Sequence, residues 1–474
     1  MIPLSKRLTV LLFFFMAASI LAGCKPKVHP WPENGVKAPE RFQNHEEAIQ
    51  FDTLEDHWWE EFGDPDINEL VNRVLKNNLD IKTASARIDE IKAYFVQTKA
   101  DRMPLIGIKA QAQRQKTAGY YTMPGADQKN DLFNLSFPAS FEIDLWGRLS
   151  SAQKAARADL LQTEETRLTL INSIIAESIS LYLTLESLER RVQLAHQTID
   201  SYRNNFDIIS NRYKRGISSF LDVKQSAGSL AQAESALPAL NQELSIVQQK
   251  LSVIAGEYPK TSPVRKKKDD YFKYHAPLEP GMPSDLLLRR PDIRAAHARL
   301  TSLQERIHVA KASRFPQISL TGNFGYASPD LDNLFKPEAE LWNLAMGISR
   351  PLFDAGRLKA NQRSAEAKFA QGIQEYAKTV LTAFFEVESA LVIRKNQLEK
   401  RERMLTLLRE SKETQTVAEL HYEKGLIDYP AVLQARQVRY QAEEGLIMTD
   451  LAILTNRVTL CRALGAGFPD PIPE

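Results

Sequence analysis

The chain has 474 residues, of which 43% are hydrophobic and 25% are charged. Its 61 lysines and arginines are balanced by 59 aspartates and glutamates, which excludes the overall basic character expected of a nucleic-acid-binding protein. There are two cysteines, Cys24 and Cys461, so modification of either one leaves no partner for an internal disulfide.

The amino terminus, residues 1–23, has the order of a secretory signal peptide. Two basic residues precede an apolar run over residues 8–22, which is too short for a comfortable membrane span. Small residues then precede Cys24, an arrangement that resembles the lipobox of bacterial lipoproteins. The resemblance implies cleavage before Cys24, which would then carry a diacylglycerol and an N-acyl chain, and Lys25 implies the outer membrane. The alternative is a plain secretory signal with a chance cysteine.

Residues 24–64 are predicted to form a segment that this lipid anchors to the membrane. Cys461 lies among apolar residues and is predicted to belong to a core. No stretch after the signal reaches the roughly 18 uninterrupted apolar residues of a membrane helix. Any later membrane crossing must therefore be made by strands.

The rest of the chain matches itself at two offsets, which indicates an internal repeat. Asp80 matches Asp292 at an offset of 212 residues, and Tyr213 matches Tyr422 at an offset of 209. The slip between these offsets must lie between residues 106 and 147, where a hairpin loop is the easiest place for an insertion. The predicted parts are a first repeat at 65–256, a linker at 257–282, a second repeat at 283–465 and a tail at 466–474.

The first repeat begins with a predicted helix over residues 65–102 and a hairpin over about 105–145. The strand residues alternate between apolar and polar side chains, so each strand has one apolar and one polar face. The loop of the hairpin is predicted at residues 119–130. Pro138 has no N–H group and is expected to weaken strand pairing at its position.

A very long helix is predicted over residues 149–214, which contain neither proline nor glycine and have apolar residues at helical spacing. Its length of roughly 100 Å exceeds what a compact globular domain needs. Gly216 is predicted to end it, and a returning helix is predicted over residues 219–255, kinked or broken at Pro238. The second repeat predicts the same elements over residues 283–314, about 317–353, 358–424 and 429–464, with its turn at Gly425.

Strands with one apolar and one polar face fit a transmembrane barrel, which has lipid on one side and water on the other. Open sheet edges do not survive in lipid, so a spanning sheet must close. Four strands are too few to close, and several chains must therefore share a barrel. Two chains would supply eight strands and three would supply twelve, and the pattern does not choose between them.

Three segments resemble the TolC-like outer-membrane factors, in particular the lipoprotein branch of resistance-nodulation-division efflux systems. They are residues 58–65 (WWEEFGDP), 283–293 (PSDLLLRRPDI) and 314–316 (RFP). The resemblance extends over nearly the whole chain. It implies an α+β membrane protein with two internal repeats, in which a homotrimer forms a twelve-stranded β-barrel, four strands per chain, continuous with a twelve-helix periplasmic coiled-coil tunnel. It also implies docking to a periplasmic adaptor protein fed by an inner-membrane pump.

In this family the turns at Gly216 and Gly425 form the periplasmic tip, where the tunnel narrows to a gate and the adaptor docks. The candidate tip residues are Tyr213, Gly216, Asp222, Tyr422, Gly425, Asp428 and Gln434. Relatives usually carry a ring of aspartates where this chain has Ala431 and Gln434, so Asp428, a turn earlier, is a candidate for partial replacement. For Asp222 a helix-start charge is an equal alternative, and the two tyrosines also suit packing.

The resemblance implies a subunit of an outer-membrane efflux channel, a passive gated conduit for small toxic compounds. The gate is expected to open when the second helical hairpin untwists on adaptor binding. An outer-membrane duct for type I protein secretion is one alternative, and a lipid-tethered periplasmic coiled-coil scaffold is another, although the scaffold leaves the strands unexplained. An enzyme is not expected, because His45 is followed by two glutamates without the second histidine of a zinc helix, and there is no phosphate loop. No cofactor or metal is expected beyond the acyl chains on Cys24.

Overall fold

The computed structural model describes residues 42, 57–116, 118, 129–263 and 289–465. The predicted signal, Cys24, most of the linker and the tail lie outside this range. Contacts divide the chain into two compact units. The described residues of the first unit lie within Gln97–Ala155 and Thr301–Gln374, and those of the second unit lie within Lys37–Val96, Ala156–Leu300 and Glu375–Glu474.

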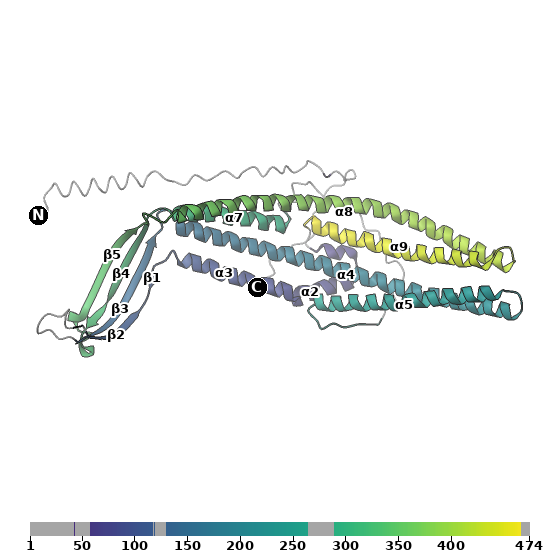
Figure 1. The fold of residues 1–474 in the computed structure, drawn as a ribbon, viewed down its shortest axis with the longest axis horizontal. Helices are drawn as coiled ribbons and strands as arrows, with labels where there is room; N and C mark the ends of the chain where they lie inside the picture. The colour runs from purple at the N-terminus through teal and green to yellow at the C-terminus, as the bar shows by residue number, and fades with distance from the viewer. Residues whose placement is uncertain (1–41, 43–56, 117, 119–128, 264–288, 466–474) are drawn as a thin grey trace. The chain divides into compact units, whose positions relative to one another are not determined.

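The first unit contains one antiparallel sheet (Figure 1). Its strands are β1 (Leu105–Ile106), β2 (Lys109–Lys116), β3 (Lys129–Ile143), β4 (Gln317–Ser328) and β5 (Glu340–Ser349). Both β1 and β2 pair with β3, β3 pairs with β4, and β4 pairs with β5. The loop between β4 and β5 contains the short 3-10 helices η3 (Leu331–Asn333) and η4 (Pro337–Ala339). Both predicted hairpins are therefore present, and β3 and β4 join them into one sheet.

Pro138 affects only one side of its strand. On that side β1 and β2 keep one register, with Ile106 opposite Ala139 and Lys109 opposite Ser136, and the break between them lies opposite the proline. The Gly107 N–H still donates to the Pro138 carbonyl at 2.9 Å. On the β4 side the pairing is uninterrupted, so the expected weakening is confirmed only where the missing N–H would have bonded to β1 and β2.

The helical elements of the first half begin with η1 (Trp58–Phe62), α2 (Pro65–Asn77) and α3 (Leu79–Ala100). The single helix predicted over residues 65–102 is wrong, because Asn78 separates two helices. Its side-chain oxygen accepts hydrogen bonds from the N–H groups of Asp80 and Ile81, at 2.9 and 3.1 Å. Its side-chain amide donates to the Ile254 carbonyl at 2.9 Å. Asn78 therefore caps α3 and ties its start to the end of a later helix.

The long helix α4 (Arg148–Lys214) and the returning helix α5 (Phe220–Ile254) lie within one residue of their predicted bounds. Of the kink or break predicted at Pro238, the break does not occur, since α5 is continuous through it. Pro238 lies on the exposed face of α5, where the carbonyl that it leaves without an intrahelical partner can bond to water.

The second half contains α7 (Pro291–Ala312), α8 (Arg357–Glu423) and α9 (Tyr429–Ala463). The helices α4 and α8 have 67 residues each, and α5 and α9 have 35 each. In the described part of the helix predicted from residue 283, Arg289 is helical, Arg290 is not, and α7 begins at Pro291. Arg290 donates to the Ala463 carbonyl at 2.8 Å, so the ends of α7 and α9 are tied as those of α3 and α5 are.

The core of the second unit collects aromatic side chains of η1 and aliphatic side chains of α2, α4 and α9. Trp58, Trp59, Ile175, Ile179 and Cys461 are all at most 2% exposed in one cluster, and the predicted core position of Cys461 is confirmed. One window within α4 is apolar and long enough to cross a membrane, although the rule of uninterrupted apolar runs did not indicate it. More than half of this window is buried inside the protein, as expected for a core helix.

Candidate functional site

The two faces of the sheet differ in chemistry because successive strand residues alternate between them. One face has Phe137 of β3, Phe324 of β4 and Trp342 of β5 side by side in one cross-strand row. On this face Trp342, Leu344 and Met346 are between 66% and 73% exposed. The opposite face consists mainly of small or uncharged polar side chains: Gln111, Gln113, Asn134, Ser136, Ser140, Ser319, Thr321, Asn323 and Asn343. The predicted segregation is therefore confirmed, and the apolar face requires an apolar surrounding.

The two helical hairpins of the second unit turn through the same backbone motif. Gly216 has φ +78° and Gly425 has φ +73°, a left-handed conformation that suits glycine. The N–H of Ile217 donates to the Arg212 carbonyl and that of Leu426 to the His421 carbonyl, both at 2.9 Å. Each long helix thus ends in a Schellman motif, and the predicted glycine turns are confirmed.

The returning helices begin differently after these turns. Ser219 and Asp222 form a capping box, in which each side chain accepts the other residue's N–H at 3.0 and 3.1 Å. These hydrogen bonds support the alternative in which Asp222 serves to start the helix α5. Asp428 occupies the equivalent of Ser219, and within the described chain its side chain makes no capping hydrogen bond. Its exposed carboxylate is therefore available at the tip.

The two tips also differ in where their aromatic rings lie. Tyr213 and Phe220 are 44% and 57% exposed and pack on each other, with ring centroids 5.8 Å apart. In the second hairpin Tyr422 is half-buried and Tyr429 is 1% exposed, with centroids 5.5 Å apart. The first tip thus presents its aromatic side chains to solvent, whereas the second inserts them into the protein.

Tyr422 and Tyr429 connect the second hairpin to the first. The Arg212 guanidinium of α4 lies 5.2 Å from the centre of the Tyr422 ring, and the Ser218 hydroxyl lies 3.4 Å from the Tyr422 hydroxyl. The Asn205 amide of α4 donates to the Tyr429 hydroxyl. Burial raises the pKa of Tyr429 to about 12, so its phenol stays neutral at physiological pH. These contacts place both tyrosines between the hairpins.

The predicted tip residues are only partly brought together. The turns place Gly216 beside Tyr213 and Gly425 beside Tyr422, whereas Gln434 lies exposed further along α9. The sequence analysis missed Tyr429 and its contacts. The available signal was an aromatic residue four positions after each turn glycine, because Phe220 and Tyr429 share that place.

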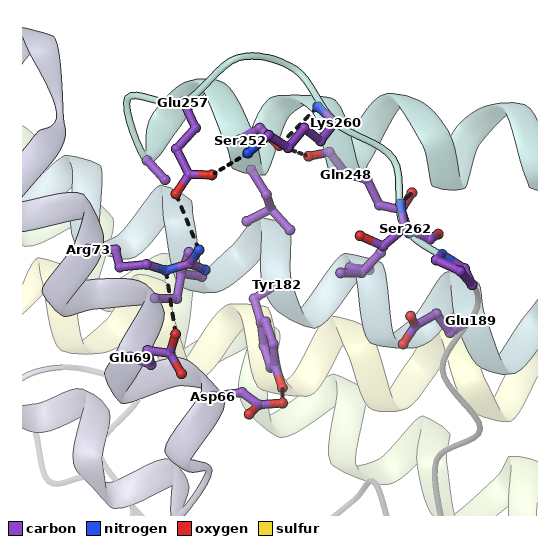
Figure 2. A pocket seen from close by; sticks show the side chains of 15 residues that line it. Asp66, Glu69, Arg73, Tyr182, Glu189, Gln248, Ser252, Glu257, Lys260 and Ser262 are labelled. Atoms are coloured by element: carbon purple, nitrogen blue, oxygen red, sulfur yellow. Dashed lines mark hydrogen bonds and ion pairs between the residues drawn. The ribbon is translucent and has the colours of Figure 1, made fainter.

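A cavity of about 370 Å³ lies in the second unit between α2, α4, α5 and the segment that follows α5 (Figure 2). Arg73 lies between Glu69 and Glu257, at 3.9 and 3.4 Å. The Gln248 side-chain amide donates to the Ser262 carbonyl and accepts its N–H, at 2.9 and 3.0 Å. These groups fasten the segment along α5. Within the described residues there is no cluster of three or more His, Cys, Asp or Glu side chains suited to a metal ion.

Comparison with known proteins shows the family in which this exposed apolar sheet and these long helical hairpins occur together. The sequence profile named outer membrane efflux protein matches residues 70–257 and 282–466 of the chain. The chain belongs to the outer membrane efflux protein family. This membership confirms the resemblance drawn from the tryptophan and RRPDI segments.

Relatives within this family align over nearly the whole chain. The solvent efflux pump outer membrane protein SrpC of Pseudomonas putida is 30% identical over 412 residues, covering 86% of each chain. The cation efflux system protein CusC of Escherichia coli is 27% identical over 460 residues, covering 96% of this chain and 98% of the relative. The solved outer-membrane channel OprN has a TM-score of 0.86 at 25% identity, covering 94% of this chain and 99% of that one.

The chain is therefore an efflux channel subunit of the outer membrane that extends into the periplasm. Its family consists of transport conduits rather than enzymes. The fold is that of the TolC-like channels, mostly helical with a few strands.

Proposed function

We propose that three copies of this chain close one twelve-stranded barrel in the outer membrane and continue as a twelve-helix tunnel in the periplasm. In the described chain β2 pairs only with β3, and β5 pairs only with β4, so each copy has two open edges. Open edges are not tolerated in lipid, and pairing β2 of one copy with β5 of the next removes them. Because β1 and β2 pair with the same edge of β3 in one register, they count as one barrel strand, and three copies supply twelve strands, enough for a water-filled passage.

The division of the sheet into an apolar and a polar face carries this proposal. The apolar face would contact lipid, and the polar face, rich in amides and hydroxyls, would line the passage. This orientation also supports a conduit over a periplasmic scaffold, which needs no exposed apolar sheet face.

Replacing the neighbouring residues Leu344 and Asn343 by arginine, one at a time, tests the orientation. Leu344 is 69% exposed on the apolar face, and Leu344→Arg is expected to prevent insertion, because an arginine near the bilayer midplane costs about 2–4 kcal/mol per copy. Asn343→Arg places the same charge on the polar face and is expected to insert normally and lower the conductance for cations. Heat-modifiable oligomer bands from outer membranes and conductance in planar bilayers measure these outcomes. Normal insertion of Leu344→Arg together with failure of Asn343→Arg would reverse the two faces.

At the periplasmic end the conduit is passive and gated at the tips, where an adaptor docks around Gly216 and Gly425 with an inner-membrane pump supplying the energy. Exposed apolar side chains at both turns, Ile217, Leu221 and Leu426, support docking there because they are 60% to 65% exposed. Acyl chains on Cys24 anchor each copy to the membrane. The proposed cargo is small toxic compounds, in line with the solvent and cation named for two relatives.

Asp428 is proposed to act as part of an acidic ring in the gate, together with its copies in the other two chains. Asp428→Ala is expected to lower the preference for cations over anions roughly twofold, because a carboxylate at a constriction attracts cations. Reversal potentials in planar bilayers under a salt gradient measure this preference. Glu423→Ala, which removes another exposed carboxylate of the same tip, is the matched control. Unchanged selectivity in Asp428→Ala would rule out the ring.

A further inference from the structure

The two hairpin tips share a backbone motif, but the aromatic side chain at one equivalent position is exposed in the first tip and buried in the second. Phe220 and Tyr429 are the first residues of α5 and α9, and each stands four positions after its turn glycine. Phe220 is 57% exposed, whereas Tyr429 is 1% exposed. A large polar-tipped ring at the very end of a hairpin is expected to reach water, so the burial of Tyr429 requires an explanation.

The ring of Tyr429 is buried by side chains from all four helices of the two hairpins. Ile209 of α4 and Ala418 of α8 belong to its buried cluster, together with Val432 of its own helix, and Val223 of α5 packs against it. Burying an aromatic ring of this size contributes about 1.5–3 kcal/mol by removal from water. The second hairpin is therefore attached to the first by a ring that it inserts into it.

The hydroxyl group of Tyr429 is satisfied entirely by the first hairpin. It accepts a hydrogen bond from the Asn205 amide of α4, and Ser226 of α5 is a second hydrogen-bond partner. Asn205 and Ser226 are 7% and 1% exposed, so neither has easy access to water in this arrangement. Loss of the hydroxyl would leave a buried amide without its partner, which is costly.

Tyr422 has weaker contacts with the first hairpin. Its ring is half-buried beneath the Arg212 guanidinium, and its hydroxyl lies 3.4 Å from that of Ser218, near the limit of a hydrogen bond. Cation–π contacts near a surface contribute less than a buried ring and a buried hydrogen bond together. Tyr422 is therefore the outer and weaker of two attachments.

Tyr429 also makes the contact nearest the tip among three side-chain contacts between α4 and α9. Further along α9, Arg436 lies 3.4 Å from the Ser201 hydroxyl of α4, and Glu444 accepts from Arg191 of α4 at 3.0 Å. These α9 positions are seven and eight residues apart, which keeps them on one side of a helix. Separation of α9 from α4 that begins at the tip must therefore first release Tyr429.

We propose that Tyr429, through its buried ring and its hydrogen bond to Asn205, is the positioning residue that holds the second hairpin against the first and keeps the channel closed. The inference rests on the proposed gated conduit and names the residue that regulates it. Opening exposes the Tyr429 phenol and the Asn205 amide to water, where both find new partners. The closed state alone depends on their pairing.

Tyr429→Phe tests the hydroxyl without emptying the ring position. In planar bilayers the purified full-length protein is expected to be open about tenfold more often, because the variant leaves the Asn205 amide unsatisfied only in the closed state. Tyr422→Phe is expected to raise opening less than about threefold. Tyr376→Phe, which removes a hydroxyl from a ring packed on His297 in the same unit, is the matched control and leaves opening unchanged.

The double variant Tyr429→Phe, Asn205→Leu distinguishes a specific pairing from a general loosening of the tip. Replacing both polar partners by apolar side chains removes the stranded amide, so opening is expected to return to within about threefold of the unchanged protein. Opening in Tyr429→Phe that equals the Tyr376→Phe control, or that the Asn205→Leu change does not reverse, overturns the role of Tyr429 while the channel itself stands. Absence of any conductance in the unchanged protein would instead overturn the conduit.

Discussion

Replacing Gly256 by alanine is expected to destabilise the helical unit by about 2–5 kcal/mol, through backbone strain and steric overlap together. Gly256 follows α5 with φ +71°, where an L side chain is strained. A Cβ atom there would lie 2.5 Å from the carbonyl oxygen of Asn77 and 3.0 Å from its carbonyl carbon. Both atoms belong to the backbone at the end of α2, so the overlap is relieved only by moving α2 away from α5.

Gly216→Ala is the matched control, because Gly216 ends a helix in the same way with φ +78° and has no atom within 4 Å of the position of a Cβ. It is expected to cost only the backbone strain, about 1 kcal/mol. Urea denaturation of the detergent-solubilised protein, followed by tryptophan fluorescence, measures both variants, since Trp58 and Trp59 are buried in the same unit. Equal losses in the two variants would show that the approach of Asn77 adds nothing.

The sequence predicted the bounds of α4 and α8 to within one residue because Gly372 of α8 is the only glycine or proline within them. Residues 149–214 lack both glycine and proline, and the first residue able to adopt a left-handed conformation cheaply is Gly216. The same reasoning failed at Asn78, which looks like one more polar helix residue. Its side-chain oxygen caps α3 locally, but its side-chain amide bonds to the Ile254 carbonyl, 176 residues further along the chain, and no local pattern reveals that second bond.

In the sheet too, local sequence patterns predicted some features, whereas contacts between distant residues could not be predicted. Alternation of apolar and polar residues predicted both hairpins and their faces, since a slip of one residue would turn every side chain over. The pairing of β3 with β4 was not predicted, because Phe141 and Leu320 meet across a separation of well over a hundred residues. Pro138 shows that a residue unsuited to a ladder is accommodated by a break in only one neighbouring strand.

The sequence predicted the two glycine turns of the candidate site but missed the burial of Tyr429. Gly216 and Gly425 are visible in the sequence because each ends a long helical pattern. The difference in exposure between Phe220 and Tyr429 is not visible in the sequence, since both residues follow their turns at the same distance. What distinguishes them is Asn205, a polar residue 224 positions from Tyr429 that is buried with it.

Arg290→Met is expected to destabilise the protein by about 3 kcal/mol, because it removes the guanidinium that neutralises Asp292 and, together with Arg462, Glu386. Arg290 donates to both carboxylate oxygens of Asp292, at 3.0 and 2.7 Å, and lies 2.8 Å from Glu386. Burial alone would lower the pKa of Arg290, but hydrogen bonds and charges from Asp292 and Glu386 raise it above its usual value. The arginine thus stays charged although its side chain is only 9% exposed.

Loss of Arg290 also removes the hydrogen bond that the Ala463 carbonyl accepts at the end of α9. Arg290→Lys is expected to recover less than half of the stability, because one ammonium cannot replace a planar fork that serves Asp292, Glu386 and a carbonyl together. The control is Arg299→Met on α7, the helix that follows Arg290; the pair of Arg299 with Glu375 is about half exposed and contributes at most about 1 kcal/mol. Urea denaturation ranks the three variants. A loss in Arg290→Met no larger than in Arg299→Met would mean that the two carboxylates find water on their own, and that the charge of Arg290 does not hold α7 to α9.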